Sequence, residues 1–342
     1  AIGAALAIWA IQWLFLTVVM ALVPCSPEVA LFARRYFYIR IWAAPATLSL
    51  MAFKGWFIGM QNTVLAMIVD IWVNIVNMLA GWWLTFHTGL GIRGVAFGTL
   101  VAQWTGLMVA AVLLLAVYRR HIRLISVSRS IKWRYIKEFF KVNGDLFVRA
   151  FSLNILYVFF TVFAARYGDV NLAVASVMMK MFMLYSYFLD GFAFAGEALS
   201  GRFIGEKNAP MLRRTVRIVF FWVAVITVLS TVAYAVFPRP MLRLVTNDPQ
   251  VLAGCEPYLF WLLLMPLLSC VAFTWAGIFV GATASVDLRN SVCISAVLFF
   301  AAYYISAPAI GCQSIYLAYF VHLAFRVLYM CLAARRAVFG KI

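Results

Sequence analysis

The sequence predicts an all-α integral membrane protein built as two pseudo-symmetric helical bundles, with about ten transmembrane helices in its 342 residues. Three observations predict this fold class: the composition, the long apolar runs and an internal repeat. Hydrophobic residues make up 66% of the chain and charged residues 11%, with a mean hydropathy of +0.98, whereas a soluble domain is about a quarter charged. This composition excludes a soluble enzyme and a disordered chain. The long runs favour helices over an outer-membrane barrel, whose strands read as ~10-residue alternating segments.

Ten apolar segments are long enough to cross a bilayer, since a spanning helix needs roughly 20 residues. They are 1–23, 36–60, 63–87, 92–117, 141–165, 170–200, 215–237, 251–282, 288–306 and 312–334. The links between them are mostly short, except 118–140, which is rich in arginine and lysine and has Glu138 as its single acid. Because the chain starts at Ala1 inside an apolar run, we expect the sequence to be truncated at its beginning.

The distribution of basic residues orients these spans, because lysine and arginine concentrate in cytoplasmic loops. With 118–140 placed inside, the inside segments hold 17 of the 28 basic residues and the outside segments hold seven. Both ends of the chain are then cytoplasmic, in a bacterial-type inner (plasma) membrane. The net charge of +17 is explained by loops at the membrane surface, so we expect the lipid bilayer and no nucleic acid as a partner.

An internal repeat relates the two halves: at an offset of 222 positions, 26–63 falls on 248–285. The matched features are a proline, a tyrosine, a mid-span proline one residue out of register and a Gly-x-x-x-Gly motif: Pro27, Tyr36, Pro45, Gly55 and Gly59, then Pro249, Tyr258, Pro266, Gly277 and Gly281. Parallel repeats of this kind form two bundles in many transporters. Two spans that precede the second copy's equivalent of 1–23 have no counterpart in the first, so we expect two more before Ala1 in the parent protein.

Three stretches of the chain resemble one known family. Residues 186–208 read SYFLDGFAFAGEALSGRFIGEKN, which resembles the eighth helix and following loop of the multidrug and toxic compound extrusion (MATE) family, in its DinF-like branch. The other two resemble the family's fourth to sixth helices: Gly55-x-x-x-Gly59 with Asn62-Thr63, and Val73-Asn74-Ile75-Val76-Asn77 with Gly91, Gly94, Gly98-Thr99 and Gln103. The resemblance covers essentially the whole chain, as helices three to twelve of the family.

The resemblance implies an incomplete N-terminal lobe at 1–130 (family helices 3–6) and a C-terminal lobe at 131–342 (family helices 7–12). It implies a secondary active exporter, which moves small organic or drug-like compounds outward in multidrug efflux by antiport with H⁺ or Na⁺. Two departures concern the N-terminal lobe. The family's coupling carboxylate lies on the first helix, which this chain lacks, and many members carry an aspartate about where Gly81 stands here.

Polar residues inside an apolar span are costly and are therefore candidate functional residues. In the N-terminal lobe, Asn74 and Asn77 lie three residues apart on one face of a helix near the middle of the span 63–87. Amides there can join helices or line a cation route. Asp70, deeper toward the inside, is a candidate proton carrier for ion coupling. We expect Lys54, near a span end, to extend to the interface.

In the C-terminal lobe, Asp145 and Arg149 are spaced for an ion pair on one helix, and Asp190 and Glu197 share a face of the next. All four fall in the cytoplasmic third of their spans. They are candidates for a charge network that closes the lobe on the inside, and a fixed polar contact within the lobe is the alternative. Arg326, near a span end, is expected to extend to the interface.

Lys180 lies about ten residues into its span, ~15 Å deep at helical rise and near the bilayer midplane. An ionisable group there costs about 2.5–3.5 kcal/mol or more. Lys180 is therefore expected to face a central cleft or a carboxylate rather than lipid. A buried ion pair that joins two helices is the structural alternative.

Three alternatives to an antiporter remain open from the sequence: a lipid-linked saccharide flippase of a related family, a membrane-embedded enzyme and an inactive truncated remnant. A flippase cleft needs several basic residues to hold pyrophosphate, and only Lys180 and Arg149 are candidates. An enzyme needs a convergent His, Asp or Cys cluster, which the spacing does not provide. We therefore expect no catalysis, no metal and no cofactor other than the coupling ion, in a monomer.

Overall fold

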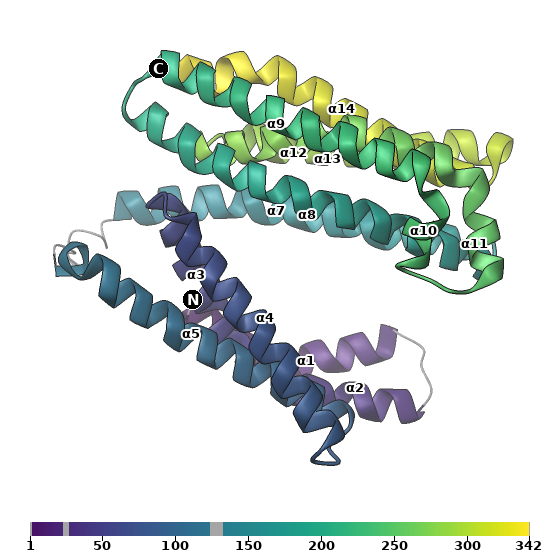
Figure 1. Cartoon of the computed structure of the whole chain (residues 1–342), viewed down its shortest axis with the longest axis horizontal. Helices are drawn as coiled ribbons and strands as arrows, with labels where there is room; N and C mark the ends of the chain where they lie inside the picture. Colours follow the sequence, from purple (N-terminus) through teal and green to yellow (C-terminus); the bar gives the residue numbers. More distant parts are fainter. Residues whose placement is uncertain (1, 23–26, 124–132, 342) are drawn as a thin grey trace. The chain divides into compact units, whose positions relative to one another are not determined.

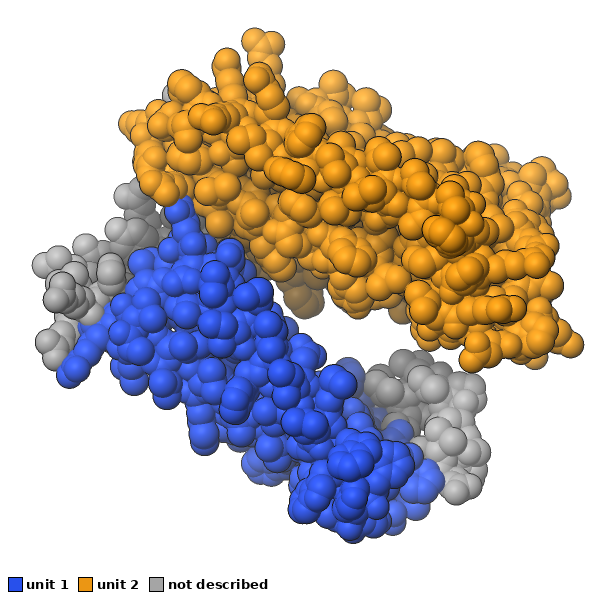
Figure 2. Space-filling view, viewed as in Figure 1, with its two compact units in different colours: residues 1–127 blue, residues 128–342 orange. Residues whose placement is uncertain are grey.

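Figure 1 shows the protein as a computed structural model, which describes residues 2–22, 27–123 and 133–341. The regular elements in these residues are all helices. The chain divides into two compact units, residues 1–127 and residues 128–342 (Figure 2). The lobe boundary predicted at 130 lies outside the described residues.

Unit 1 contains five α-helices and a short 3₁₀ turn: α1 (Ile2–Leu22), α2 (Pro27–Arg40), η1 (Ile41–Ala43), α3 (Ala44–Gly59), α4 (Thr63–Phe86) and α5 (Ile92–Arg123). Unit 2 contains long helices joined by short ones: α7 (Trp133–Ala165), α8 (Asp169–Gly205), α9 (Ala209–Val236), α10 (Pro238–Arg243), α11 (Pro249–Cys255), η2 (Glu256–Tyr258), α12 (Leu259–Gly281), α13 (Ser285–Ile310), α14 (Gln313–Ala337) and η3 (Phe339–Lys341).

Nine helical segments of the described residues are long and apolar enough to cross a membrane. They coincide with nine of the ten predicted spans and confirm the all-α membrane fold. The first predicted span, 1–23, forms α1, of which Gly3–Thr17 is a shorter apolar helix.

Helices α7 and α8 are longer than predicted. Helix α7 begins at Trp133, inside the segment expected to be the loop 118–140, and α8 runs to Gly205 rather than ending near 200. The 37 residues of α8 rise ~55 Å, well beyond a hydrocarbon core of ~30 Å. The start of α7 and the end of α8 therefore extend as helix beyond the apolar runs from which the spans were predicted.

Unit 1 is held together chiefly by the contact of α4 with α5, while α3 packs against both. Small residues make this contact close. A Cβ atom on Gly94 would lie 2.6 Å from the backbone of Leu84, and one on Gly98 would lie 2.5 Å from the Cα of Gly81. Helices in a membrane associate through such close backbone packing, because lipid supplies no hydrophobic force between them.

Unit 2 is organised around α8, which packs against α12, α9, α11 and α7. One side of α8 is buried and mostly apolar, and it includes Val174, Met178, Met181, Phe182, Tyr185 and Leu189. Polar atoms on this side are paired: the hydroxyls of Tyr185 and Thr227 lie 2.7 Å apart, and Tyr234 Oη donates to the carbonyl of Met181 at 2.9 Å. Pairing of this kind is needed where neither water nor lipid offers partners.

The internal repeat is visible in the backbone. The segments Pro27–Gly59 and Pro249–Gly281 begin and end on positions 222 apart. Each ends in the same turn: Gln61 and Thr283 have positive φ (60° and 52°), and Asn62 N and Ala284 N each donate to the carbonyl five residues back. This is a Schellman-type helix ending, so the repeated sequence has a repeated local structure.

Candidate functional site

In unit 1, the polar residues predicted to serve ion coupling, Asp70, Asn74 and Asn77, all lie on α4. Lys54 Nζ on α3 donates to Asp70 Oδ1 on α4 at 2.9 Å, with the side chains 32% and 52% exposed. Lys54 therefore has a carboxylate partner on the neighbouring helix, and its extension to the interface stays a prediction. A proton or cation that binds Asp70 must compete with this ammonium.

The two asparagines of α4 lie on the surface of unit 1. Asn74 is exposed, and its Nδ2 donates to the backbone carbonyl of Asp70 at 2.8 Å. The amide of Asn74 therefore bonds within its own helix rather than across to another. Asn77, one turn further along α4, is half-buried. Asp70, Asn74 and Asn77 together form a polar stripe on one helix, and their predicted role in ion coupling stays a prediction.

In unit 2, Asp145 on α7 is buried, with 5% of its surface exposed. Its carboxylate accepts from Ser285 Oγ at 2.7 Å and from Arg289 Nη1 at 2.5 Å, both on α13. The predicted pair of Asp145 with Arg149 is therefore wrong, since Arg289 is the partner. Ser285 is the first residue of α13, so the N-terminal end of that helix also favours the buried charge.

Arg149, which does not pair with Asp145, lies on α7 near Asp190 and Glu197 of α8. The charges of Glu197 and Asp190 act on its guanidinium, and so does that of Arg326 on α14. Yet the ion pairs of the described residues do not include Arg149, and its Nε is buried without a protein partner. We call Arg149, Asp190, Glu197 and Arg326 the C-lobe charge cluster.

Arg326 lies deep inside unit 2 instead of reaching an interface. It is 4% exposed, and one turn before it His322 is 1% exposed. Arg326 Nε and His322 Nδ1 are both buried without a protein partner. The expectation that Arg326 extends to the interface is wrong, because α14 packs against both α12 and α13.

Lys180 is exposed on the side of α8 opposite the buried apolar residues. It belongs to none of the ion pairs that the structure describes. The carboxylate partner offered as one possibility for Lys180 is therefore not found among the described residues. A role facing a cleft stays a prediction.

The charge cluster gives unit 2 a group of polar atoms that its own side chains do not fully satisfy. Buried donors without protein partners are places where water, an ion or a substrate forms the remaining hydrogen bonds. In the described residues, no three His, Cys, Asp or Glu side chains are grouped as a metal site. Asp190 and Glu197 are carboxylates beside the guanidinium of Arg149, and carboxylates can take up a proton or a cation.

Sequence reasoning missed the residues that come from distant helices. Ser285 and Arg289 form the site of Asp145 across 140 and 144 positions, and Arg326 enters the cluster from α14. A signal was present for Arg289, the single basic residue of the segment between spans 251–282 and 312–334. His322 gave no signal beyond being a histidine inside an apolar run.

Comparison with known proteins gives consistent matches. The MatE family model matches residues 1–83 and 146–306. DNA damage-inducible protein F of Escherichia coli is 28% identical over 98% of this chain and 73% of its own length. Protein DETOXIFICATION 44, chloroplastic, of Arabidopsis thaliana is 23% identical over 92% of this chain, which spans 59% of that protein.

Solved structures share the fold. The MATE transporter VcmN of Vibrio cholerae superposes with a TM-score of 0.86 at 16% identity, over 98% of this chain and 76% of that one. A transporter of the MOP superfamily from Pyrococcus furiosus gives a TM-score of 0.87 at 15% identity, over 99% and 76%.

Proposed function

The chain belongs to the MatE family of membrane transporters, and on that premise we propose that it exports small organic compounds in exchange for H⁺ or Na⁺. As a member it is an integral plasma-membrane transporter of the efflux type. Transport across a membrane, rather than catalysis, is the activity that we assign to it. The exchange with an ion and the class of compound are the proposed part.

The observation that carries the exchange mechanism is the C-lobe charge cluster. Asp190 and Glu197 lie two turns apart on α8, both near Arg149 of α7 without forming an ion pair with it. A rigid structural ion pair would place the charged atoms in contact, as Arg289 and Asp145 are. Acids held near a cation but not in contact with it remain able to take up another positive charge.

Exchange of substrate for an ion would follow because H⁺ or Na⁺ competes with Arg149 for Asp190 and Glu197. When H⁺ or Na⁺ neutralises Asp190 or Glu197, its attraction to Arg149 is lost, and the preferred arrangement of α7 against α8 changes. An ion can shift such an equilibrium only by its difference in affinity for the two arrangements. A substrate that favours the arrangement without the ion is thereby coupled to ion release, with reciprocal effects on the two affinities.

The test is transport by the purified protein in liposomes loaded with a fluorescent organic cation. We expect efflux that is driven by an imposed H⁺ or Na⁺ gradient, and we expect Glu197→Gln and Asp190→Asn to uncouple it at least about tenfold, the size of a ~1.4 kcal/mol interaction. The matched control is Glu206→Gln, an exposed acid that ends α8 and pairs with Arg202. Normal gradient-driven efflux by both cluster variants would show that these acids are structural.

One observation favours a second candidate, a flippase for lipid-linked saccharides. Arg149 and Arg326 each have a buried Nε without a protein partner, and guanidinium groups bind phosphate well. Transport of an anionic amphiphile, abolished by Arg149→Gln and independent of ion gradients, would support the flippase over the antiporter.

A further inference from the structure

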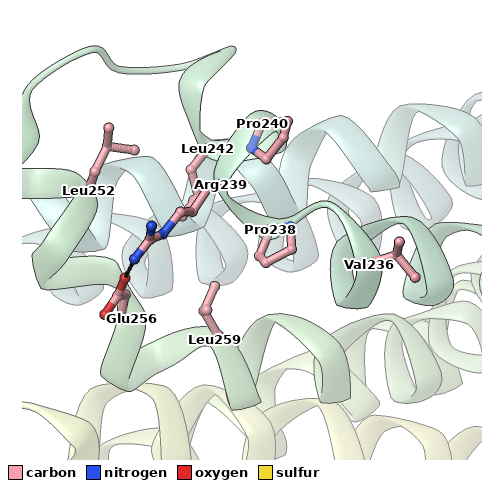
Figure 3. Close-up of a pocket in the computed structure, with 8 residues that line it drawn as sticks. All are labelled: Val236, Pro238, Arg239, Pro240, Leu242, Leu252, Glu256 and Leu259. Atoms are coloured by element: carbon pink, nitrogen blue, oxygen red, sulfur yellow. Dashed lines mark hydrogen bonds and ion pairs between the residues drawn. The ribbon is translucent and has the colours of Figure 1, made fainter.

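A cavity at one end of unit 2 is separate from the C-lobe charge cluster and is not used by the proposed transport. Its volume is about 440 Å³, which lies within the range of ~300–1,000 Å³ that is typical of small-molecule sites. Figure 3 shows its lining, which comes from the end of α9, from α10, from α11, from η2 and from the start of α12: Val236, Pro238, Arg239, Pro240, Leu242, Leu252, Glu256 and Leu259.

The position of the cavity is at the edge of the apolar spans. Helix α9 ends its span at Val236, and the next span begins at Pro249. The segment between them, 237–248, carries the charges of Arg239, Arg243 and Asp248. The cavity therefore opens where the hydrocarbon core gives way to the headgroup layer, which occupies the outer part of a ~40–45 Å bilayer.

Two charged groups face each other in this cavity. Arg239 Nη2 and Glu256 Oε1 lie 2.7 Å apart, and the side chains are 75% and 50% exposed. The dashed line in Figure 3 marks this contact. An exposed ion pair contributes only about 0–1 kcal/mol to stability, and a guanidinium has further N–H groups on its outer edge. The pair is therefore open to a ligand.

The remaining walls are apolar and rigid. Leu242, Leu252 and Leu259 surround the charged pair, and Leu242 is only 1% exposed. Pro238 and Pro240 flank Arg239 on α10, and each proline ring fixes its own φ. Arg239 is thus held on a segment with few alternative backbone conformations, which reduces the entropy lost when a ligand binds.

We propose that this cavity binds a zwitterionic phospholipid with a primary ammonium headgroup, as in phosphatidylethanolamine. The lipid phosphate accepts hydrogen bonds from Arg239, and its ammonium donates to Glu256. The four charges then alternate in sign, so that each has opposite neighbours. Leu252 and Leu259, which are both half-buried, contact the first methylenes of the acyl chains.

The Arg239–Glu256 pair has no net charge, and this determines which lipid headgroup binds best. A site with Arg239 alone would favour anionic phosphatidylglycerol, whereas Glu256 repels an anion and attracts an ammonium. Phosphatidylcholine carries a positive charge but no N–H group, so it cannot donate to Glu256. We expect phosphatidylethanolamine to bind with about tenfold higher affinity than the other two lipids, which corresponds to one charge-assisted hydrogen bond.

The test is native mass spectrometry of the whole chain in detergent, with each of the three lipids added at equal concentration. We expect Arg239→Gln to weaken retention of all three lipids. Glu256→Gln should reverse the order in favour of phosphatidylglycerol. The control is Arg243→Gln, an exposed charge on the same short helix that does not line the cavity, and it should leave the order unchanged.

A second arm separates a lipid from a free headgroup. Glycerophosphoethanolamine has the same phosphate and ammonium but no acyl chains, and we expect it not to displace the bound lipid. Displacement at equal concentration would show that the cavity binds a soluble headgroup compound, and the lipid proposal would be wrong. Equal retention of the three lipids by the unchanged protein, or no effect of Arg239→Gln, would also overturn it.

Discussion

The two copies of the internal repeat begin and end at equivalent residues and share their terminal turn. They differ in where a 3₁₀ turn interrupts the helix and in what packs against them. In unit 2, a Cβ atom on Gly277 would overlap the carbonyl of Ala193, and one on Gly281 would overlap that of Glu197, both on α8. Among the described residues of unit 1, a Cβ atom on Gly55 or Gly59 would have no neighbour within 4 Å. Both copies therefore end as helices with the same turn, but among the described residues only the second copy has a helix, α8, packed against its glycines.

The ion pairs also differ between the units, because the pair in unit 2 has a buried acid and the pair in unit 1 is exposed. Asp145 in unit 2 is buried and has two partners, Ser285 and Arg289. Asp70 in unit 1 pairs with Lys54 while half of its side chain is exposed. Burial decides the energetic value of such a pair, because breaking a buried pair leaves an uncompensated charge and breaking an exposed one does not.

The largest effect is expected at Asp145. Asp145→Ala leaves Arg289 and Ser285 without their acceptor and should lower stability by about 3–5 kcal/mol. The measurement is the yield of folded protein after detergent extraction, together with the thermal unfolding midpoint. The control is Glu206→Ala, which removes an exposed acid that pairs with Arg202 four residues away. It should lower stability by only about 0.3–0.5 kcal/mol. Equal yields for the two variants would mean that the Asp145 site does not hold α7 against α13.

An intermediate effect is expected inside unit 1, where α4 and α5 are close. Gly98→Ala puts a methyl group 2.5 Å from the Cα of Gly81, and overpacking of this kind costs roughly 1–3 kcal/mol. The unfolding midpoint should fall accordingly. If Gly98→Ala is neutral, α4 and α5 can move apart at little cost, and their close backbone contact is not what stabilises unit 1.

The smallest effect is expected for the exposed pair. Lys54→Met should change stability by no more than about 1 kcal/mol, because the lost ion pair is screened by solvent. Binding of H⁺ or Na⁺ at Asp70 should instead become easier, since the Lys54 ammonium no longer competes for its carboxylate. Isothermal titration with Na⁺ measures this directly, and tighter Na⁺ binding that disappears in the double variant with Asp70→Asn would assign the ion to Asp70. A large loss of stability would show that Lys54 and Asp70 are a structural pair.

The spans and the repeat could be predicted from the sequence because both depend on local patterns. Apolar length predicts nine of the spans that the structure contains, and the proline and glycine spacing predicts the repeat of 26–63 at 248–285, whose helical segments are Pro27–Gly59 and Pro249–Gly281. Helical extensions such as the start of α7 at Trp133 could not be predicted from hydropathy, since charged residues there are mixed with apolar ones and no continuous apolar run marks the helix.

The charged partners were predicted less well, because each choice depended on tertiary contacts. The spacing of Asp145 and Arg149 fits an ion pair, but Arg289 arrives from another helix 144 positions away. Lys54 and Arg326 were placed by their distance from a span end, which takes no account of a neighbouring carboxylate or of a covering helix. The shared helical face of Asp190 and Glu197, by contrast, follows from periodicity alone.

The most direct test of the difference between the two copies is a pair of thermal unfolding measurements on Gly277→Ala and Gly55→Ala. A methyl group at Gly277 meets the backbone of α8, so we expect its midpoint to fall by roughly 2–10 °C, from a cost of about 1–3 kcal/mol. Gly55→Ala meets no atom within 4 Å and gains helix propensity of about 1 kcal/mol, so its midpoint should stay level or rise slightly. Equal losses for the two variants, or a larger loss for Gly55→Ala, would contradict the claim that α8 is what distinguishes the second copy from the first.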